Sequence, residues 1–105
     1  MIRHIVAWKF APEAHGATAQ QNARILKERL EALAPQIQGL VSLHVGLDIG
    51  ADSHYHAVLE STFVDQAALD AYKVHPEHKQ ISAFCKSVRE DRVAVDYLLP
   101  DGQEG

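Results

Sequence analysis

The block from Tyr72 to His78 holds the densest group of side chains that could take part in a reaction. Its sequence is Tyr-Lys-Val-His-Pro-Glu-His, so one phenol and two imidazoles lie within a short stretch. A tyrosine hydroxyl donates a hydrogen bond, and a neutral histidine accepts a proton near neutral pH. Together they suit the removal of a proton from a carbon next to a carbonyl, with the hydroxyl stabilising the enolate oxygen. The structural alternative is that His75 caps a helix beginning at Pro76 and that Tyr72 packs at the edge of the core.

The chain is rich in histidine, with seven among its 105 residues. His4 lies on the same face of a predicted strand as Trp8, so we expect its imidazole to be buried and neutral. The spacing of His75 and His78, taken with His4, also permits a three-histidine metal site, but no cysteine or carboxylate supports it. We therefore predict a site that uses neither a metal nor a cofactor.

Composition narrows the class of protein. Apolar residues make up 47% and charged residues 23%, which is typical of one soluble globular domain. The net charge of −4 argues against a nucleic-acid partner. A single cysteine, Cys85, excludes a disulfide framework and a cysteine-based zinc site. No apolar run is long enough to cross a membrane and no signal peptide is recognisable, so we expect a cytoplasmic protein.

Periodicity predicts four strands and three helices. Alternating apolar residues predict strands over 2–10, 40–49, 55–63 and 92–99. Apolar spacings of three and four predict helices over 19–33, 65–73 and 76–88. A turn centred near Ala51 joins the middle strands and is expected to pair His44 with Leu59. We expect the polar tail 100–105 to be disordered.

This order of elements favours a ferredoxin-like α+β fold, a four-stranded antiparallel sheet with its helices on one face. The strands then carry more apolar side chains than one layer of helices can cover. The residues expected on the open face are Ile5, Ala7, Val41, Leu43, Val45 and Leu47. A bare apolar sheet face predicts a homodimer that packs sheet against sheet, forming a dimeric α/β barrel.

Four segments resemble one known family, the stress-responsive dimeric α/β-barrel (Dabb) family. They are Ile2–Phe10, Gly46–Ile49, Ala71–His78 and Arg92–Tyr97. The His-Pro-x-His block that follows a helical tyrosine is the most specific of them. The resemblance covers residues 2–98 and implies one domain over 2–99, with a ferredoxin-like fold and a dimeric assembly.

The resemblance also implies roles for single residues. One characterised member, olivetolic acid cyclase of plants, is a cofactor-free polyketide cyclase that performs an intramolecular aldol closure. Its catalytic tyrosine and histidine match Tyr72 and His78, and one of its pocket histidines matches His4. Another pocket histidine of that enzyme falls at Ala57 here, so the resemblance does not fix the substrate. We add Trp8 and His75 as candidate ligand contacts.

Two hypotheses follow. The first is a stress-response domain of unassigned reaction, with a pocket for a small apolar or polyketide-like ligand between sheet and helices. The second is a cofactor-free enzyme of the aldol or cyclase type. The enzyme requires Tyr72, His78 and His4 to converge on one cavity that opens to solvent. A cavity filled by aromatic side chains would instead favour the binding protein.

Overall fold

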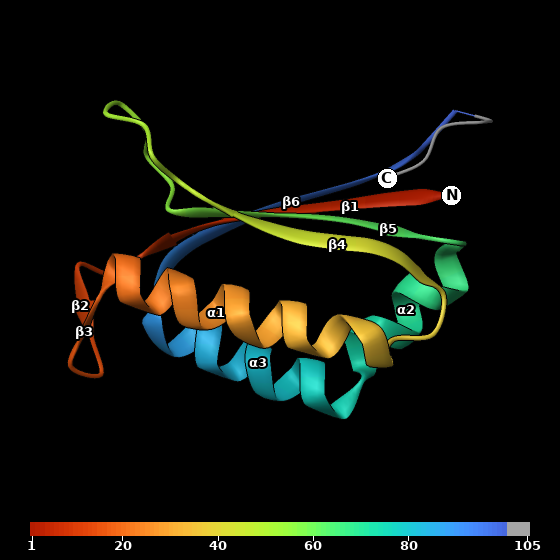
Figure 1. Cartoon of the computed structure of the whole chain (residues 1–105), viewed down its shortest axis with the longest axis horizontal. Coiled ribbons are helices and arrows are strands. Elements are labelled where there is room, and N and C mark those ends of the chain that lie inside the picture. Colours follow the sequence, from red (N-terminus) through yellow and green to blue (C-terminus); the bar gives the residue numbers. More distant parts are fainter. Residues whose placement is uncertain (101–105) are drawn as a thin grey trace.

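A computed structural model describes residues 1–100 of the chain (Figure 1). Its elements are β1 Ile2–Phe10, β2 Glu13–Ala14, β3 Ala17–Thr18, α1 Ala19–Leu33, the short 3-10 helix η1 Ala34–Gln36, β4 Leu40–Leu47, β5 Ala57–Phe63, α2 Gln66–Val74, α3 Pro76–Val88 and β6 Arg89–Leu98. Of the predicted tail, only Pro100 falls among these residues; 101–105 lie outside the part described. None of the helices in residues 1–100 is both long and apolar enough to span a membrane.

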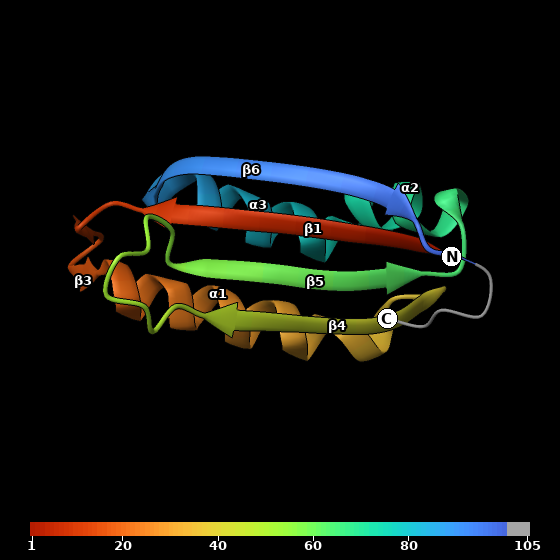
Figure 2. The same cartoon turned by 90° about the horizontal axis from the view of Figure 1, so that it is seen from above.

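The four long strands form one antiparallel sheet in the order β4-β5-β1-β6. In the register of this sheet, Val6 of β1 lies opposite Leu59 of β5 and His4 of β1 lies opposite Asp96 of β6. Helices α1, α2 and α3 all cover the same face, and Figure 2 looks onto the other face, with the helices behind the strands. This is the ferredoxin-like arrangement that the order of elements predicts.

Local sequence sets the ends of the helices. Thr18 begins α1 with a capping box, in which its hydroxyl and the side chain of Gln21 each accept a backbone N–H of the other residue. Asp65 caps α2 by accepting the N–H of Ala68. His75 is extended, with φ −60° and ψ 131°, because the proline that follows it disfavours the helical conformation. The chain therefore turns between α2 and α3 at His75.

The core lies between the sheet and the helices. Its main cluster joins β1 to α1, α3, β4 and β5. The buried members of that cluster are Val6, Trp8, Phe10, Ala19, Ala23, Leu26, Leu30, Val45, Ala57, Leu59, Cys85 and Val88. A second cluster around Phe63, Leu69 and Tyr72 packs α2 against the end of β5. Trp8 and Tyr72 thus belong to the layer in which a ligand site was predicted.

The face that β4 presents to the helices corrects one prediction. Val45 is fully buried and pairs with Leu59, which pairs in turn with Val6 on the helix side of the sheet. Leu43 and Leu47 share that side and pack on the core. The prediction that these residues of β4 lie on the open face is wrong, because alternation separates two faces without saying which one the helices cover. The expected pairing of His44 is also wrong by one residue, since His44 lies opposite Glu60.

The open face is apolar through other strands. Ile5 lies opposite Val95, and Ala7 lies between Val58 and Val93. We call this set the open-face strip: Ile5, Ala7, Val58, Val93, Val95 and Tyr97. Its valines and Tyr97 are exposed, Val95 by 54%. The loop between β4 and β5 extends away from the helices on this side (Figure 1).

Candidate functional site

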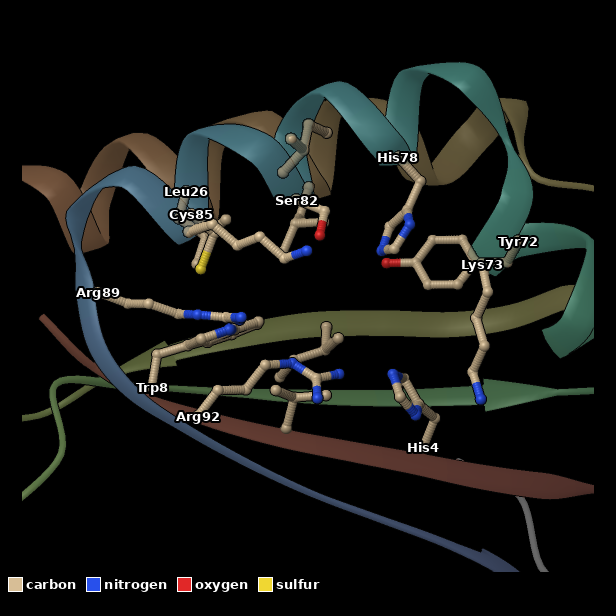
Figure 3. Close-up of a pocket in the computed structure, with 15 residues that line it drawn as sticks. His4, Trp8, Leu26, Tyr72, Lys73, His78, Ser82, Cys85, Arg89 and Arg92 are labelled. Atoms are coloured by element: carbon tan, nitrogen blue, oxygen red, sulfur yellow. The ribbon is translucent and has the colours of Figure 1, made fainter.

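A cavity of about 210 Å³ lies between the sheet and the helices, and it opens to solvent. Figure 3 shows the side chains that point into it. They are His4, Val6, Trp8, Leu26, Leu30, Leu59, Tyr72, Lys73, His78, Ile81, Ser82, Cys85, Lys86, Arg89 and Arg92. Its floor is therefore the sheet, and its roof is formed by α1, α2 and α3.

Tyr72 and His78 face each other in this cavity. Tyr72 comes from the last turn of α2 and His78 from the first turn of α3, so the turn at His75 brings them together. Their ring centroids are 4.2 Å apart. Tyr72 is only 2% exposed. The Tyr72 hydroxyl and the Nδ1 atom of His78 are buried, and neither has a hydrogen-bond partner among residues 1–100.

Unpaired buried polar atoms are unfavourable. Each one costs about 1–3 kcal/mol relative to a hydrogen-bonded group. Native proteins have few of them, and each asks for an explanation. Two such atoms belong here to neighbouring side chains that both line the cavity.

Burial sets the protonation states of this pair. It raises the pKa of Tyr72 far above its usual value, and the nearby charge of Arg92 offsets only part of that shift. The hydroxyl therefore stays protonated and remains a donor. Burial also lowers the pKa of His78, although the backbone carbonyl of Lys73 favours the protonated form. His78 is thus a neutral imidazole that can accept a proton.

His4 lies on β1 across the cavity from Tyr72, and Asp96 holds its ring. The His4 Nδ1 atom is 2.5 Å from Asp96 Oδ1, and Lys73 Nζ lies 3.5 Å from Asp96 Oδ2. Burial lowers the pKa of His4 despite the neighbouring carboxylate. Burial acts to raise the pKa of Asp96, but the hydrogen bond from His4 and the Lys73 charge outweigh it and lower that pKa.

A neutral His4 beside an ionised Asp96 must carry its proton on Nδ1 and donate it to the carboxylate. Its other ring nitrogen then accepts, and Figure 3 shows that nitrogen turned toward the cavity. Asp96 is not among the residues that the sequence predicts for the site. The signal for it was the strand register, since His4 and Asp96 are paired across β1 and β6.

Of the two remaining predicted site residues, one lines the cavity and the other does not. Trp8 lines the cavity and is 5% exposed. His75 does not line it: its Nδ1 accepts the backbone N–H of Glu77 at 3.2 Å and caps α3. His75 is therefore removed from the candidate ligand contacts, because its imidazole satisfies the first turn of the helix instead.

Metal ligation finds no support in residues 1–100, which contain no group of three or more His, Cys, Asp or Glu side chains that could hold an ion. The three-histidine alternative requires His75 beside His4 and His78 in the cavity, and His75 is not among the lining residues. Cys85 lines the cavity as a buried thiol, and burial raises its pKa, so it stays protonated.

Sequence analysis also missed four basic side chains of the lining. These are Lys73, Lys86, Arg89 and Arg92. They come from the ends of α2 and α3 and the beginning of β6, and only the folded chain places them around one cavity. Nothing in their spacing marked them, because helix ends and edge strands commonly carry exposed cations.

These features define a ferredoxin-like domain with a cavity between the sheet and the helices, lined by a tyrosine and two neutral histidines. The chain belongs to the stress responsive A/B barrel domain (Dabb) family, whose profile matches residues 2–99.

One curated relative is the stress-response A/B barrel domain-containing protein DABB1 of Arabidopsis thaliana. It is 33% identical over 63 residues, which are 60% of this chain but only 30% of that protein. The match thus spans less than a third of the relative's length.

Two solved structures illustrate the fold. A dimeric protein of unknown function from Bacteroides fragilis is 26% identical, with a TM-score of 0.81 over 93% of this chain and 95% of that one. A hydroxynitrile lyase from Passiflora edulis is 17% identical, with a TM-score of 0.78 over 98% and 96% of the two chains. Proteins described so differently share this fold, so the fold alone does not define a reaction.

Proposed function

We propose that this protein is a cofactor-free enzyme that moves a proton at a carbon next to a carbonyl, in a reaction of the aldol or cyclase type. The observation that carries the proposal is that Tyr72 and His78 line one open cavity, and that each has a buried polar atom, Tyr72 Oη and His78 Nδ1, without a hydrogen-bond partner among residues 1–100. His4 faces the same cavity, so the three residues converge as such an enzyme requires. Of the three aromatic side chains that could fill the cavity, Trp8 lines it, whereas Phe84 and Tyr97 are not among the lining residues.

The proposed step begins with the neutral imidazole of His78. It takes the proton from the carbon, and the C–H electron pair moves to the carbonyl oxygen as an enolate. The Tyr72 hydroxyl donates a hydrogen bond to that oxygen, which is worth more in a buried site than in water. The carbon then attacks a second carbonyl of the same ligand. The alkoxide so formed takes the proton back from the His78 imidazolium, and no other reactant is consumed.

His4 has a different part in this proposal. Its cavity-facing nitrogen accepts a hydrogen bond, so it suits a hydroxyl or enol group of the ligand. Asp96 fixes the ring and its tautomer from behind. Trp8 and the aliphatic side chains of the floor and roof hold the apolar part of a small or polyketide-like ligand. That apolar wall equally suits a binding protein without turnover, which is the second candidate.

We also propose that the protein is a homodimer through the open-face strip. The strip is exposed and apolar across β1, β5 and β6, as an interface requires. The similar protein from Bacteroides fragilis is described as dimeric. Two sheets packed face to face would bury both strips and form the barrel.

Turnover measurements test the proposed enzyme. The substrates are a panel of β-diketones and longer polyketo compounds, and the variants are Tyr72→Phe and His78→Gln. We expect each change to lower the rate by about 100-fold, and the double variant to lose little more because the pair acts as a unit. The matched controls are Tyr97→Phe and His54→Gln, which lie outside the cavity and should leave the rate unchanged.

Two results would count against the enzyme. Turnover that neither variant affects would remove Tyr72 and His78 from the mechanism. Saturable binding of the panel without any turnover by the wild type would favour the binding protein.

A further inference from the structure

We propose that the ligand of this cavity carries a carboxylate, which Arg89 and Arg92 bind from the beginning of β6. This inference concerns the same cavity as the proposed function and takes the ligand's carbonyl from it. The class of ligand is then a small acid with an apolar body and a carbonyl. A keto acid has all three parts.

The charge of the lining is the first support. The whole chain has 14 acidic and 10 basic residues. The cavity reverses this balance, because its lining holds four basic side chains and no carboxylate. Like charges gathered at a partly enclosed site repel one another and attract an anion. The positive charge of the cavity is therefore a local feature of this site and does not follow from the composition of the whole chain.

The second support is the lack of partners. Lys73 is paired with Asp96. Arg89, Arg92 and Lys86 form no ion pair with any carboxylate in the part of the chain that the structure describes. Other exposed cations do find partners, such as Lys9 with Glu90. The two arginines are thus available to an anion from outside.

The third support is direction. Arg89 and Arg92 begin β6, and Figure 3 shows both side chains reaching into the cavity near Trp8 and Cys85. The positive charge of Arg92 also acts inside the site, where it contributes to lowering the pKa values of His4 and His78. Guanidinium groups suit a carboxylate because their planar N–H donors match its two oxygens.

This placement gives the ligand an orientation. The carboxylate lies at the arginines, and the apolar body lies along Leu26, Leu30 and Ile81. The carbonyl then points toward Tyr72 and His78, which line the same cavity. At about 210 Å³ the cavity is below the roughly 300–1,000 Å³ of drug-sized sites, so the acid is small.

Trp8 reports binding directly, because it is the only tryptophan of the chain and lines the cavity. Its fluorescence is titrated with hexanoate and with hexanamide, which has the same chain without the charge. We expect hexanoate to bind at least about 10-fold more tightly, a difference of about 1.4 kcal/mol. The preference should shrink as salt is added, since screening weakens the attraction.

The variants locate the effect. Arg89→Gln and Arg92→Gln should each remove most of the preference for hexanoate, and Arg92→Lys should retain part of it. The matched control is Arg24→Gln, an exposed arginine of α1 outside the cavity, which should keep the full preference. Thermal melts of each variant show whether it is folded.

Three results would overturn the proposal: equal affinity for hexanoate and hexanamide, no saturable binding of hexanoate, or a preference that both glutamine variants retain. Tighter binding of inorganic phosphate than of hexanoate would also overturn it. The proposed enzyme is tested separately, because Tyr72→Phe and His78→Gln should leave the hexanoate preference intact. A protein that binds hexanoate through the arginines but turns over no carbonyl compound would sustain this inference and refute the enzyme.

Discussion

Tyr72 and His78 meet because a proline ends one helix and begins the next. Without the turn at His75, a tyrosine and a histidine six residues apart on one continuous helix would point to different sides. The turn sets the phenol at the end of α2 against the imidazole at the start of α3. Because both helices pack on the same sheet face, the pair also meets His4 on β1.

The neutral histidines of the cavity predict a pH dependence of stability. Burial holds the pKa values of His4 and His78 below the ordinary value of about 6.5. Above that pH both residues are neutral in the folded and the unfolded chain. As the pH falls, the unfolded chain binds protons first, so the free energy of unfolding decreases until the lower pKa of the folded state is passed. Thermal melts between about pH 7.5 and about pH 5 should therefore show a falling Tm.

The contribution of each histidine is separable in the same melts. His78→Gln and His4→Gln should each reduce the dependence of Tm on pH, because glutamine does not titrate. His54→Gln is the control, since His54 is exposed and should leave the dependence unchanged. A Tm that stays constant over this range in the wild type would show that His4 and His78 are solvated.

For single residues, the sequence shows which side chains could take part in chemistry. It does not show which side chains lie next to them in the folded chain. The sequence predicts Tyr72 and His78 from their chemistry and from the family resemblance, and His4 from its face of the first strand, and all three line one cavity together with Trp8. Asp96 and the basic lining residues are not predicted, because their significance depends on which strand lies beside β1 and on how α3 leads into β6. The periodicity of apolar residues predicts each strand or helix, but it does not predict which strands pair with each other.

The helices α2 and α3 are joined by a residue that serves both. His75 is the C-cap of α2 and also the N-cap of α3. In the second role its Nδ1 accepts the backbone N–H of Glu77. We expect His75→Ala to lower the free energy of unfolding by about 1 kcal/mol, because that N–H loses its partner. His75→Asn keeps a side-chain acceptor and should restore most of the stability. Urea denaturation measures both changes.

The same two variants decide whether His75 has any role in the site. If it is only a cap, His75→Asn keeps the affinity for hexanoate and the rate of the wild type. Loss of either property in a variant of full stability would return His75 to the ligand contacts.

Alternation of apolar residues predicts the strands but not the face that each strand turns toward the helices. The pattern in 40–49 correctly predicts a strand, which the structure places at Leu40–Leu47. It does not say which face meets the helices, and the expectation that Leu43, Val45 and Leu47 lie on the open face is wrong. What decides the face is the register with β5 and, through it, with β1. The open face was still predicted to be apolar, because Ile5 and Ala7 alternate with the buried residues of β1.

Contacts from α1 protect the outer edge of β4. The carboxylate of Glu31 accepts the backbone N–H of Val45, and Lys27 donates to the carbonyl of the same residue. Backbone groups that an edge strand would otherwise offer to another strand are thus already bonded. Association of two copies is therefore expected through the sheet face rather than through this edge.

The whole molecule is one sheet with helices covering one face, and its other face is apolar and exposed. Val95 lies within the open-face strip and is 54% exposed. If that strip is the interface of a homodimer, Val95→Asp buries an unpaired carboxylate at each subunit contact, which costs several kcal/mol. Light scattering at micromolar concentration should show a dimer for the wild type and a monomer for Val95→Asp.

A control of the same chemistry lies elsewhere on the surface. Val74 of α2 is 63% exposed and lies outside the sheet, so Val74→Asp should remain dimeric. A wild-type protein that is a stable monomer, or a Val95→Asp variant that stays dimeric, would contradict the assembly through this strip.

The central claim is that one cavity brings a ligand carbonyl to Tyr72 and His78. A crystal structure of the wild type with bound 4-oxopentanoate, a small keto acid, tests it most directly. The account predicts the ketone oxygen within hydrogen-bonding distance of the Tyr72 hydroxyl and the carboxylate at Arg89 and Arg92. A cavity that stays empty at saturating keto acid, or a Tyr72 hydroxyl bonded to another protein group with the ligand elsewhere, would contradict it.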